Sequence, residues 1–285
     1  MTPEYSPVNK SRRSFLKRSL NGAFIITATN ALSPLQKNLF SLVPPSKIAC
    51  RIAVASDGHY GQPITAFDLM HTQMINWLNE EKASRGINFS VINGDIVHDD
   101  ASLLPRVKAR WDSLKMPYYI THGNHDRIDE QSWKSIWNLP WHYSIEHKNA
   151  AFIFLNSADD KGTYICPDAE WTKNELQRYA SKKHVLVFMH ITPFSWTKSG
   201  LPCPVIAELF AKQPNVKAIF HGHDHDQDDV KENNGKHYFF DSHIGGNWGT
   251  EYHGYRIIEI LKNGDILTYQ MNPSLNVKVN KNDLT

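Results

Sequence analysis

The chain has 285 residues, of which 41% are hydrophobic, and its formal net charge is +2. A chain of this length is ample for one sizeable core but short for two independent domains. It contains no repeat, no low-complexity tract and no basic patch of the kind that binds nucleic acid, so the nucleic-acid-binding classes are excluded.

The first 31 residues form a basic leader. Residues 11–17, Ser-Arg-Arg-Ser-Phe-Leu-Lys, resemble the twin-arginine export motif, and a moderately apolar stretch follows at 23–31. That stretch is too short for a stable membrane span, and residues 29–31 offer a cleavage site. We therefore expect a twin-arginine signal sequence over 1–31, the twin-arginine export machinery as a partner, and a periplasmic or secreted bacterial protein. We expect no stable membrane span after export, and a net charge near −2 once five basic and one acidic residue are removed with the leader.

The rest of the chain is expected to form a single domain. Residues 32–48 contain three prolines and are predicted to link the leader to this domain. The domain is expected over 49–275, and residues 276–285 are expected to be a C-terminal tail.

Five short apolar runs, rich in β-branched and aromatic residues, predict buried β-strands. They cover residues 51–56, 88–93, 117–121, 184–189 and 216–220. Amphipathic stretches predict helices at 67–82, 103–114 and 169–182. The alternation of strands and helices indicates a layered α/β domain with a mainly parallel core. A hairpin around Asn263-Gly264, within 255–269, is predicted to complete the second sheet.

A cluster rich in Asp, His or Asn follows each of the five runs. The clusters are Asp57-Gly58-His59, Gly94-Asp95, Gly123-Asn124-His125-Asp126, His190 and Gly222-His223-Asp224-His225. Ligands gather outside the carboxyl ends of strands in such folds, so these residues should meet at one edge. Carboxylate, amide and imidazole groups suit zinc, manganese or iron better than calcium or magnesium. Asp57 with His59, and His223 with His225, are spaced so that both members of each pair can point to one side of an extended backbone.

In this order the clusters resemble the pattern of the calcineurin-like metallophosphoesterases, which is D-x-H, GD, GNH, a single H and GHxH, across residues 51–225. The resemblance implies a four-layer αββα sandwich, an α/β (α+β) single domain whose two mixed β-sheets are flanked by helices. It implies two divalent metal ions (Mn, Fe or Zn), with Asp95 bridging them. The first ion would be held by Asp57, His59 and His225, and the second by Asn124, His190 and His223.

The resemblance also implies phosphoester hydrolysis by a metal-activated hydroxide, with His125 assisting the departure of the leaving oxygen. Many relatives have the pattern GDxxD, in which the second Asp positions the catalytic histidine, whereas here His98 occupies that place. The purple acid phosphatases have a Tyr there as an iron(III) ligand, so His98 argues against those enzymes. The partner of His125 stays open between Asp99 and Asp126, and His98 is expected to face the substrate.

The size of the chain and its GNHD and GHDH segments resemble the phosphodiesterase branch, so we expect a phosphodiesterase acting on a small phosphoester substrate. A broad-specificity phosphomonoesterase on the same site is the alternative. A non-catalytic metal-dependent binding module ranks last, because such proteins would be expected to lack ligands or His125. Trp196 and Trp248 are the candidate substrate contacts, although loop aromatics more often pack within their own loop.

The remaining histidines and the cysteines carry weaker signals. Five histidines are expected at the surface or in packing: His71, His142, His147, His184 and His237. Five other residues are candidates for orienting ligands: His122, His221, Asp224, His243 and His253. Cys166 and Cys203 lie in proline-flanked, loop-like segments and are the candidate disulfide pair in an oxidising compartment, whereas Cys50 is expected to be a packed thiol.

Overall fold

The computed structural model describes residues 43–273 and 277–284, so the expected leader lies outside the described residues. Within these ranges, none of the helices has the length and apolar character needed to cross a bilayer.

The first sheet contains the strands that carry the first three clusters. Its order is β12-β11-β10-β1-β2-β3, and β1, β2 and β3 run parallel to one another. β10 pairs antiparallel with β1, so the sheet is mixed. The bounds are β1 Ile48–Ala55, β2 Phe89–Asn93, β3 Tyr118–Thr121, β10 Tyr255–Leu261, β11 Ile266–Asn272 and β12 Val277–Leu284.

The second sheet carries the other two clusters. Its order is β4-β5-β6-β7-β9-β8, with a parallel centre and antiparallel strands at both edges. The bounds are β4 Tyr143–His147, β5 Ala150–Leu155, β6 His184–Met189, β7 Val216–His221, β8 Val230–Asn233 and β9 Lys236–Phe240.

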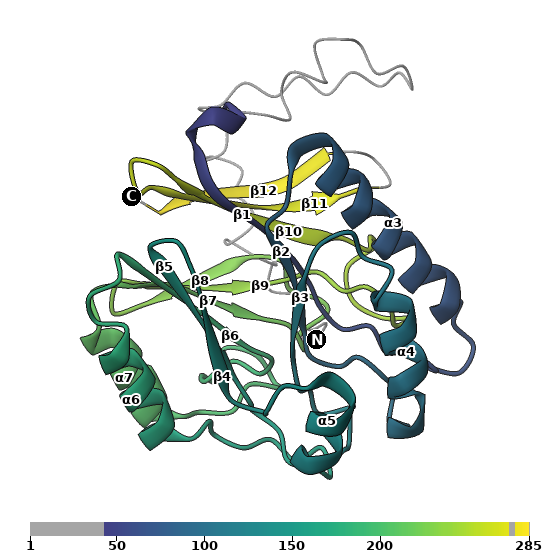
Figure 1. Cartoon of the computed structure of the whole chain (residues 1–285). Helices are drawn as coiled ribbons and strands as arrows, with labels where there is room; N and C mark the ends of the chain where they lie inside the picture. The colour runs from purple at the N-terminus through teal and green to yellow at the C-terminus, as the bar shows by residue number, and fades with distance from the viewer. Residues whose placement is uncertain (1–42, 274–276, 285) are drawn as a thin grey trace, which may run out of the picture. The chain divides into compact units, whose positions relative to one another are not determined.

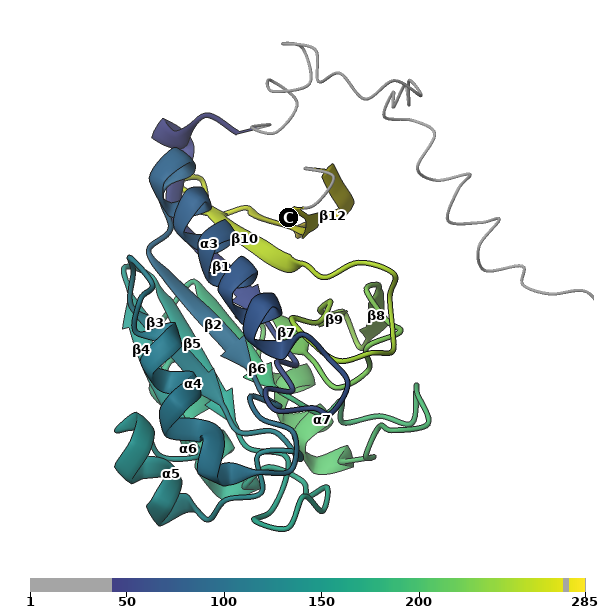
Figure 2. The same cartoon turned by 90° about the vertical axis from the view of Figure 1, so that its right-hand side faces the viewer.

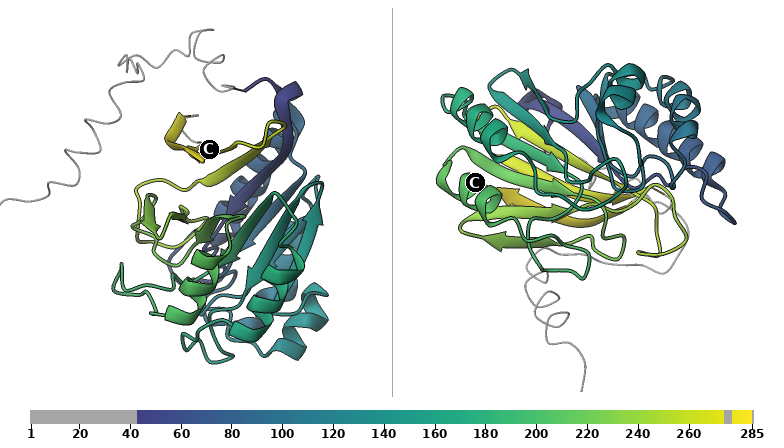
Figure 3. Two further views of the ribbon diagram at one scale, coloured as in Figure 1. Left: turned by 90° about the vertical axis from the view of Figure 1, so that its left-hand side faces the viewer. Right: turned by 90° about the horizontal axis from the view of Figure 1, so that it is seen from below.

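Helices cover the outer face of each sheet. α3 and α4 lie over the first sheet, and α6 and α7 lie over the second (Figures 1, 2 and 3). The arrangement is the expected single α/β domain with two mixed sheets between helices. The bounds are η1 Pro45–Lys47, α3 Phe67–Arg85, η2 Ala101–Leu103, α4 Leu104–Trp111, α5 Glu130–Trp137, α6 Ala169–Arg178 and α7 Pro204–Lys212.

The main core lies between the two sheets and follows from strand alternation. On β5, Phe152 and Phe154 belong to this core, whereas Ile153 and Leu155 belong to a second core with residues of α6 and α7. Four phenylalanines on neighbouring strands of the second sheet form a stacked row, with ring centroids 5.2–5.3 Å apart. The row consists of Phe154, Phe188, Phe220 and Phe239.

The C-terminal end differs from the prediction in the sheet that the hairpin joins and in the structure of residues 276–285. The hairpin of β10 and β11 is present, but it extends the first sheet, because β10 pairs along β1 on the edge opposite β2. Residues 276–285, expected to be a tail, contain β12, which pairs along β11 from Asn272 to Ile266. The sheet therefore continues to Leu284, beyond the expected domain boundary at 275.

Candidate metal centre

The five clusters follow the carboxyl ends of strands in both sheets, and Asn93 joins these ends. Its side-chain amide donates to the carbonyl of Phe220 (3.0 Å), and its Oδ1 accepts from the hydroxyl of Thr121 (2.8 Å). Its backbone carbonyl accepts from His190 Nδ1 (2.8 Å). Asn93 is fully buried, so this residue ties β2 and β3 to β6 and β7 at the edge where the clusters lie.

Asp57, His59 and His225 converge on the first centre. The two Nε2 atoms of His59 and His225 lie 2.9 Å apart, and Asp57 Oδ1 lies 3.2 Å from His225 Nε2 and 4.0 Å from His59 Nε2. All three residues are buried. One oxygen and two ring nitrogens thus surround one point, which can hold a metal ion.

Asp95, His190 and His223 form the second centre, with ligand atoms within 4.8 Å of one another. Asp95 Oδ2 lies 3.0 Å from His190 Nε2 and 3.7 Å from His59 Nε2, so the same oxygen reaches both centres. At this centre, Asn124 Oδ1 and His223 Nε2 are buried atoms without a hydrogen-bond partner among the described residues. A cation bound beside the Asp95 carboxylate would give these two atoms a partner.

The electrostatics of the two centres fit a metal pair. Burial lowers the pKa of His59 to about 3 and that of His223 to about 4, so both rings are neutral and able to bind a metal. Burial also opposes charge on His190, but Asp95 and Asp57 outweigh it and raise the pKa of His190 to about 10. Two buried carboxylates therefore draw positive charge into the site, and divalent ions would supply it.

The backbone at the candidate ligands is strained. Asp57, His59, Asp95 and His223 have φ values of 56°, 42°, 50° and 68°, in the left-handed region that non-glycine residues seldom adopt. Such residues cost of the order of 1–3 kcal/mol each and cluster at functional sites. The spacing of Asp57 with His59, and of His223 with His225, predicted extended backbone, and this prediction is wrong because both pairs include left-handed residues. His223 and His225 also belong to different centres.

Two glycines make this crowding possible. A Cβ on Gly94 would lie 2.3 Å from His190 Nδ1, and one on Gly222 would lie 1.9 Å from Ser56 Oγ. Ser56 in turn donates to Asp57 Oδ2, and the His223 amide donates to Asp57 Oδ1 (2.9 Å). Glycine at these positions thus lets neighbouring loops approach and hold the Asp57 carboxylate.

The ring of His125 lies 4.9 Å from that of His59 between ring centroids, and His125 takes its orientation from Asp99. Its Nδ1 lies 2.8 Å from Asp99 Oδ1, and Arg127 Nε contacts the same oxygen at 2.9 Å. The expected alternative, Asp126, does not occupy this place. Its fully buried carboxylate accepts the backbone amides of Ile96, Val97 and Gly123 instead, so it holds the loops together.

The aromatic candidates separate into one at the site and one away from it. Trp248 stacks on His225, with ring centroids 4.4 Å apart, and its side chain is 42% exposed. Trp196 instead is half-buried and packs against Phe194 (4.0 Å between ring centroids) and Tyr238 (5.1 Å), at the margin of the core formed with α6 and α7. The structure thus places Trp248 against a candidate ligand and Trp196 in packing, while substrate contact by either ring stays a prediction.

His98 lies at the site, as expected. Its ring stacks on that of His125 with centroids 4.9 Å apart and an interplanar angle of 10°. Its Nδ1 lies 3.0 Å from Nδ1 of His59.

Among the five candidates for orienting ligands, His243 contacts a candidate ligand, since its ring stacks on His225 at 4.6 Å. The other four contact groups outside the proposed ligand set: His122 with Asn156, His221 with the carbonyl of Met189, Asp224 with Thr197, and His253 with His243.

Sequence reasoning assigned no role at the site to three residues that contact it. His71, expected in packing, is buried as expected, and its Nε2 donates to the carbonyl of Gly58 (2.9 Å) while Nδ1 accepts from Trp111 Nε1 (3.1 Å). It therefore fixes the turn between Asp57 and His59. Arg127 contacts Asp99, and the ring of Tyr164 meets that of His223 edge-on at 4.9 Å. Of these three residues, only Arg127 could have been suspected from the sequence, because it follows His125 by two residues.

A disulfide joins Cys166 and Cys203, as the sequence suggested, with Cα atoms 5.6 Å apart. Cys50 is a free, buried thiol, also as expected. The bridge links the loop that carries Tyr164 to the segment between His190 and α7, so it braces the loops beside the second centre.

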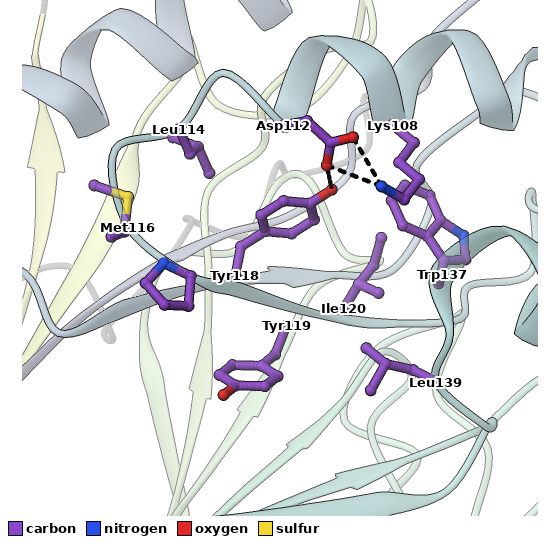
Figure 4. Close-up of a pocket in the computed structure, with 10 residues that line it drawn as sticks. Lys108, Asp112, Leu114, Met116, Tyr118, Tyr119, Ile120, Trp137 and Leu139 are labelled. Carbon is purple, nitrogen blue, oxygen red and sulfur yellow. Dashed lines mark hydrogen bonds and ion pairs between the residues drawn. The ribbon is translucent and has the colours of Figure 1, made fainter.

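The cavity shown in Figure 4 is separate from this site. It lies between α4, β3 and α5, and none of the candidate ligands lines it. Its carboxylate, Asp112, already pairs with Lys108 (2.8 Å) and accepts from the Tyr118 hydroxyl (2.7 Å), so this polar group is satisfied within the protein.

The layered fold and the paired His/Asp clusters define a metal-dependent hydrolase with a dinuclear site. The chain belongs to the calcineurin-like phosphoesterase family, whose model matches residues 50–227. It is accordingly a metal-dependent phosphoric ester hydrolase. No curated protein matches the chain in sequence.

Solved structures share the fold at low identity. A dimetal phosphatase from Danio rerio is 12% identical with a TM-score of 0.64, over 84% of this chain and 99% of that one. A purple acid phosphatase, PPD1, from yellow lupin (Lupinus luteus) is 11% identical with a TM-score of 0.62, over 85% of this chain and 54% of that one. Sulfate thiohydrolase SoxB from Thermus thermophilus is 12% identical with a TM-score of 0.50, over 85% of this chain and 57% of that one. These likenesses show the fold alone.

Proposed function

We propose that this protein is an exported phosphodiesterase that hydrolyses a small phosphodiester with two divalent metal ions (Mn, Fe or Zn). The observation that carries the proposal is the convergence of Asp95 with two sets of ligands on adjacent centres. Asp57, His59 and His225 would hold the first ion, and Asn124, His190 and His223 the second. Two ions there would lower the pKa of a shared water and neutralise the phosphate oxygens.

His125 is the residue proposed to move a proton. Its Nδ1–H donates to Asp99, whose carboxylate is itself held by Arg127, so Nε2 is the atom left for the substrate. From this position Nε2–H would donate to the departing oxygen. Asp95 Oδ1 accepts the His125 backbone amide (2.8 Å), which couples the position of His125 to the residue shared by the two centres.

The charges around the site favour a diester over a monoester. A monoester carries up to two negative charges and a diester carries one, so a monoester needs more positive groups around it. The guanidinium of Arg127 is offset by Asp99, and Tyr164 and Trp248 contribute neutral aromatic groups, so His98 and His125 are the remaining side chains beside the centres that could meet a second negative charge. This balance supports the phosphodiesterase over the phosphomonoesterase.

Substrate class is tested by the rates on bis-nitrophenyl phosphate and nitrophenyl phosphate, measured with Mn²⁺-loaded protein. We expect the larger kcat/KM on the diester. A larger value on the monoester would contradict the diester preference and assign the enzyme to the phosphatases.

Export is proposed from the leader motif, and the disulfide supports it. Disulfides persist in oxidising compartments such as the periplasm and are rare in the cytosol. The test is to replace Arg12 and Arg13 by Lys together and to follow the protein in cell fractions. We expect it to stay in the cytoplasm, whereas the matched Arg18→Lys variant is exported. Unchanged export of the double variant would contradict the proposal.

A further inference from the structure

Three of the histidines proposed as ligands have a described partner on the ring nitrogen opposite the metal-facing one. His190 Nδ1 lies 2.8 Å from the carbonyl oxygen of Asn93, and His225 Nδ1 lies 3.3 Å from that of Trp248. A carbonyl only accepts, so these rings carry their proton on Nδ1 and leave Nε2 free. His59 differs, because its Nδ1 faces Nδ1 of a side chain, His98, at 3.0 Å.

The same logic sets the tautomer of His98. If His59 offers Nε2 to the first centre, its Nδ1 carries the proton and donates it. His98 Nδ1 must then accept, and the proton of the neutral His98 ring must sit on Nε2. Among the described residues, no protein group is bonded to that Nε2, so this N–H is left for another partner.

The backbone holds His98 in this position. The His98 amide donates to the carbonyl of Tyr60 (3.0 Å), and the Asp99 amide donates to that of His125 (2.9 Å). His98 therefore lies between the loop of His59 and the loop of His125, with its ring parallel to that of His125. The ring of His98 is thus stacked on the ring of the proposed proton donor, His125.

We propose that His98 is a positioning residue that fixes His59 as an Nε2 ligand of the first metal ion and presents its own Nε2–H to a phosphate oxygen of the substrate. The proposal rests on the proposed function and deepens it. It links metal affinity at one centre to substrate binding through a single neutral ring. Loss of such an outer partner typically weakens metal binding about 10- to 100-fold.

The first test measures Mn²⁺ affinity by calorimetry on metal-stripped protein, with each centre isolated in turn. In an Asn124→Ala background, which reports the first centre, we expect His98→Ala to weaken binding about 10- to 100-fold. In a His225→Ala background, which reports the second centre, we expect no change. His237→Ala, on strand β9, is the matched control and should change neither affinity.

The second test separates positioning from simple loss of packing. Gln can accept from His59 with its oxygen and donate with its nitrogen, so His98→Gln should recover most of the metal affinity. In the otherwise unchanged enzyme, we expect His98→Ala to raise KM for bis-nitrophenyl phosphate at saturating Mn²⁺, and His98→Gln to raise it less. Thermal unfolding of each variant shows whether the fold is retained.

Several results would overturn the proposal. In the affinity measurements, the proposal fails if His98→Ala leaves the Mn²⁺ affinity of the first centre unchanged, or weakens both centres equally. It also fails if His98→Gln restores no more affinity than His98→Ala. A third Mn²⁺ ion bound by the wild type through His59, His98 and His125 would contradict it as well. Metal titration needs no turnover. A wild type that binds two ions but cleaves no phosphoester would refute the proposed function, while the affinities still decide the role of His98.

Discussion

At the scale of single residues, the site depends on side chains that fix one another. His125 is oriented by Asp99, Asp99 is shared with Arg127, and Nδ1 of His59 is paired with Nδ1 of His98. Each contact leaves one defined atom for a metal ion or for the substrate. The chemistry of the site therefore lies in which ring nitrogen is left free.

Replacing His125 by Ala removes the proposed proton donor. We expect turnover of a diester with a poor alkoxide leaving group to fall about 10²- to 10⁴-fold, since general acid catalysis contributes this much. The loss should be smaller with nitrophenolate, which leaves without a proton. Steady-state kinetics on both substrates, with His237→Ala as control, check this, and equal losses would speak against the acid role.

The buried ion pair of Arg256 and Asp241 allows a test of stability. Arg256 donates to Asp241 and to the carbonyl of Phe240 (3.1 Å), and both charged side chains are fully buried. Removing one partner of a buried pair costs about 3–5 kcal/mol. We expect Arg256→Met to lose about this much free energy of unfolding at neutral pH, measured by urea unfolding.

The same variant has an expected pH dependence. Burial raises the pKa of Asp241 to about 6, although Arg256 opposes the rise. Because this pKa lies above that of the unfolded chain, about 3.9, the folded state binds the proton more tightly, and stability falls as pH rises through 6. Without Arg256 the rise is unopposed, so the deficit of Arg256→Met should be larger at pH 7.5 than at pH 5. The control is Lys231→Met, which removes a surface pair with Asp229 worth about 0–1 kcal/mol. The account is contradicted if the loss of stability in Arg256→Met does not depend on pH, or if it is no larger than the loss in Lys231→Met.

At the scale of elements, strand ends were predictable and loops were not. The β-branched and aromatic runs end within one residue of the ends of β1, β2, β3, β6 and β7, so the clusters after them could be assigned to one edge. Asp99, which contacts His125, has a left-handed backbone with φ of 63°. No sequence pattern predicts this conformation, so the sequence could not decide between Asp99 and Asp126. Tyr164 lies in a loop without periodicity, and the packing of Trp196 against Phe194 and Tyr238 could not be predicted from its place in a loop.

The disulfide offers a test at this scale. Cys166 and Cys203 are 37 residues apart, and a bridge that closes a loop of this size stabilises a protein by about 2–4 kcal/mol. We expect the double Cys166→Ser, Cys203→Ser variant to unfold at lower temperature than the wild type in scanning calorimetry. A reductant should lower the melting temperature of the wild type and leave that of the double variant unchanged. If the reductant has no effect on the wild type, the bridge does not stabilise the fold.

At the scale of the whole molecule, the packing of the two sheets brings loops from both of them together at one edge. Ligands from the first sheet (Asp57, His59, Asp95 and Asn124) and from the second (His190, His223 and His225) share one edge. The order of the motifs allowed this edge and its fold to be predicted, because parallel strands present their carboxyl ends on one side. The sheet assignment of the C-terminal hairpin could not be predicted, since alternating hydrophobic residues indicate a strand but not its neighbour.

The central claim is that one shared carboxylate organises two metal ions for phosphoester hydrolysis. The most direct measurement is the turnover of bis-nitrophenyl phosphate by the wild type and by Asp95→Ala, with the bound metal counted in both proteins. We expect two ions and turnover in the wild type, and a folded Asp95→Ala protein with fewer ions and no turnover. Undiminished turnover in Asp95→Ala would contradict the account.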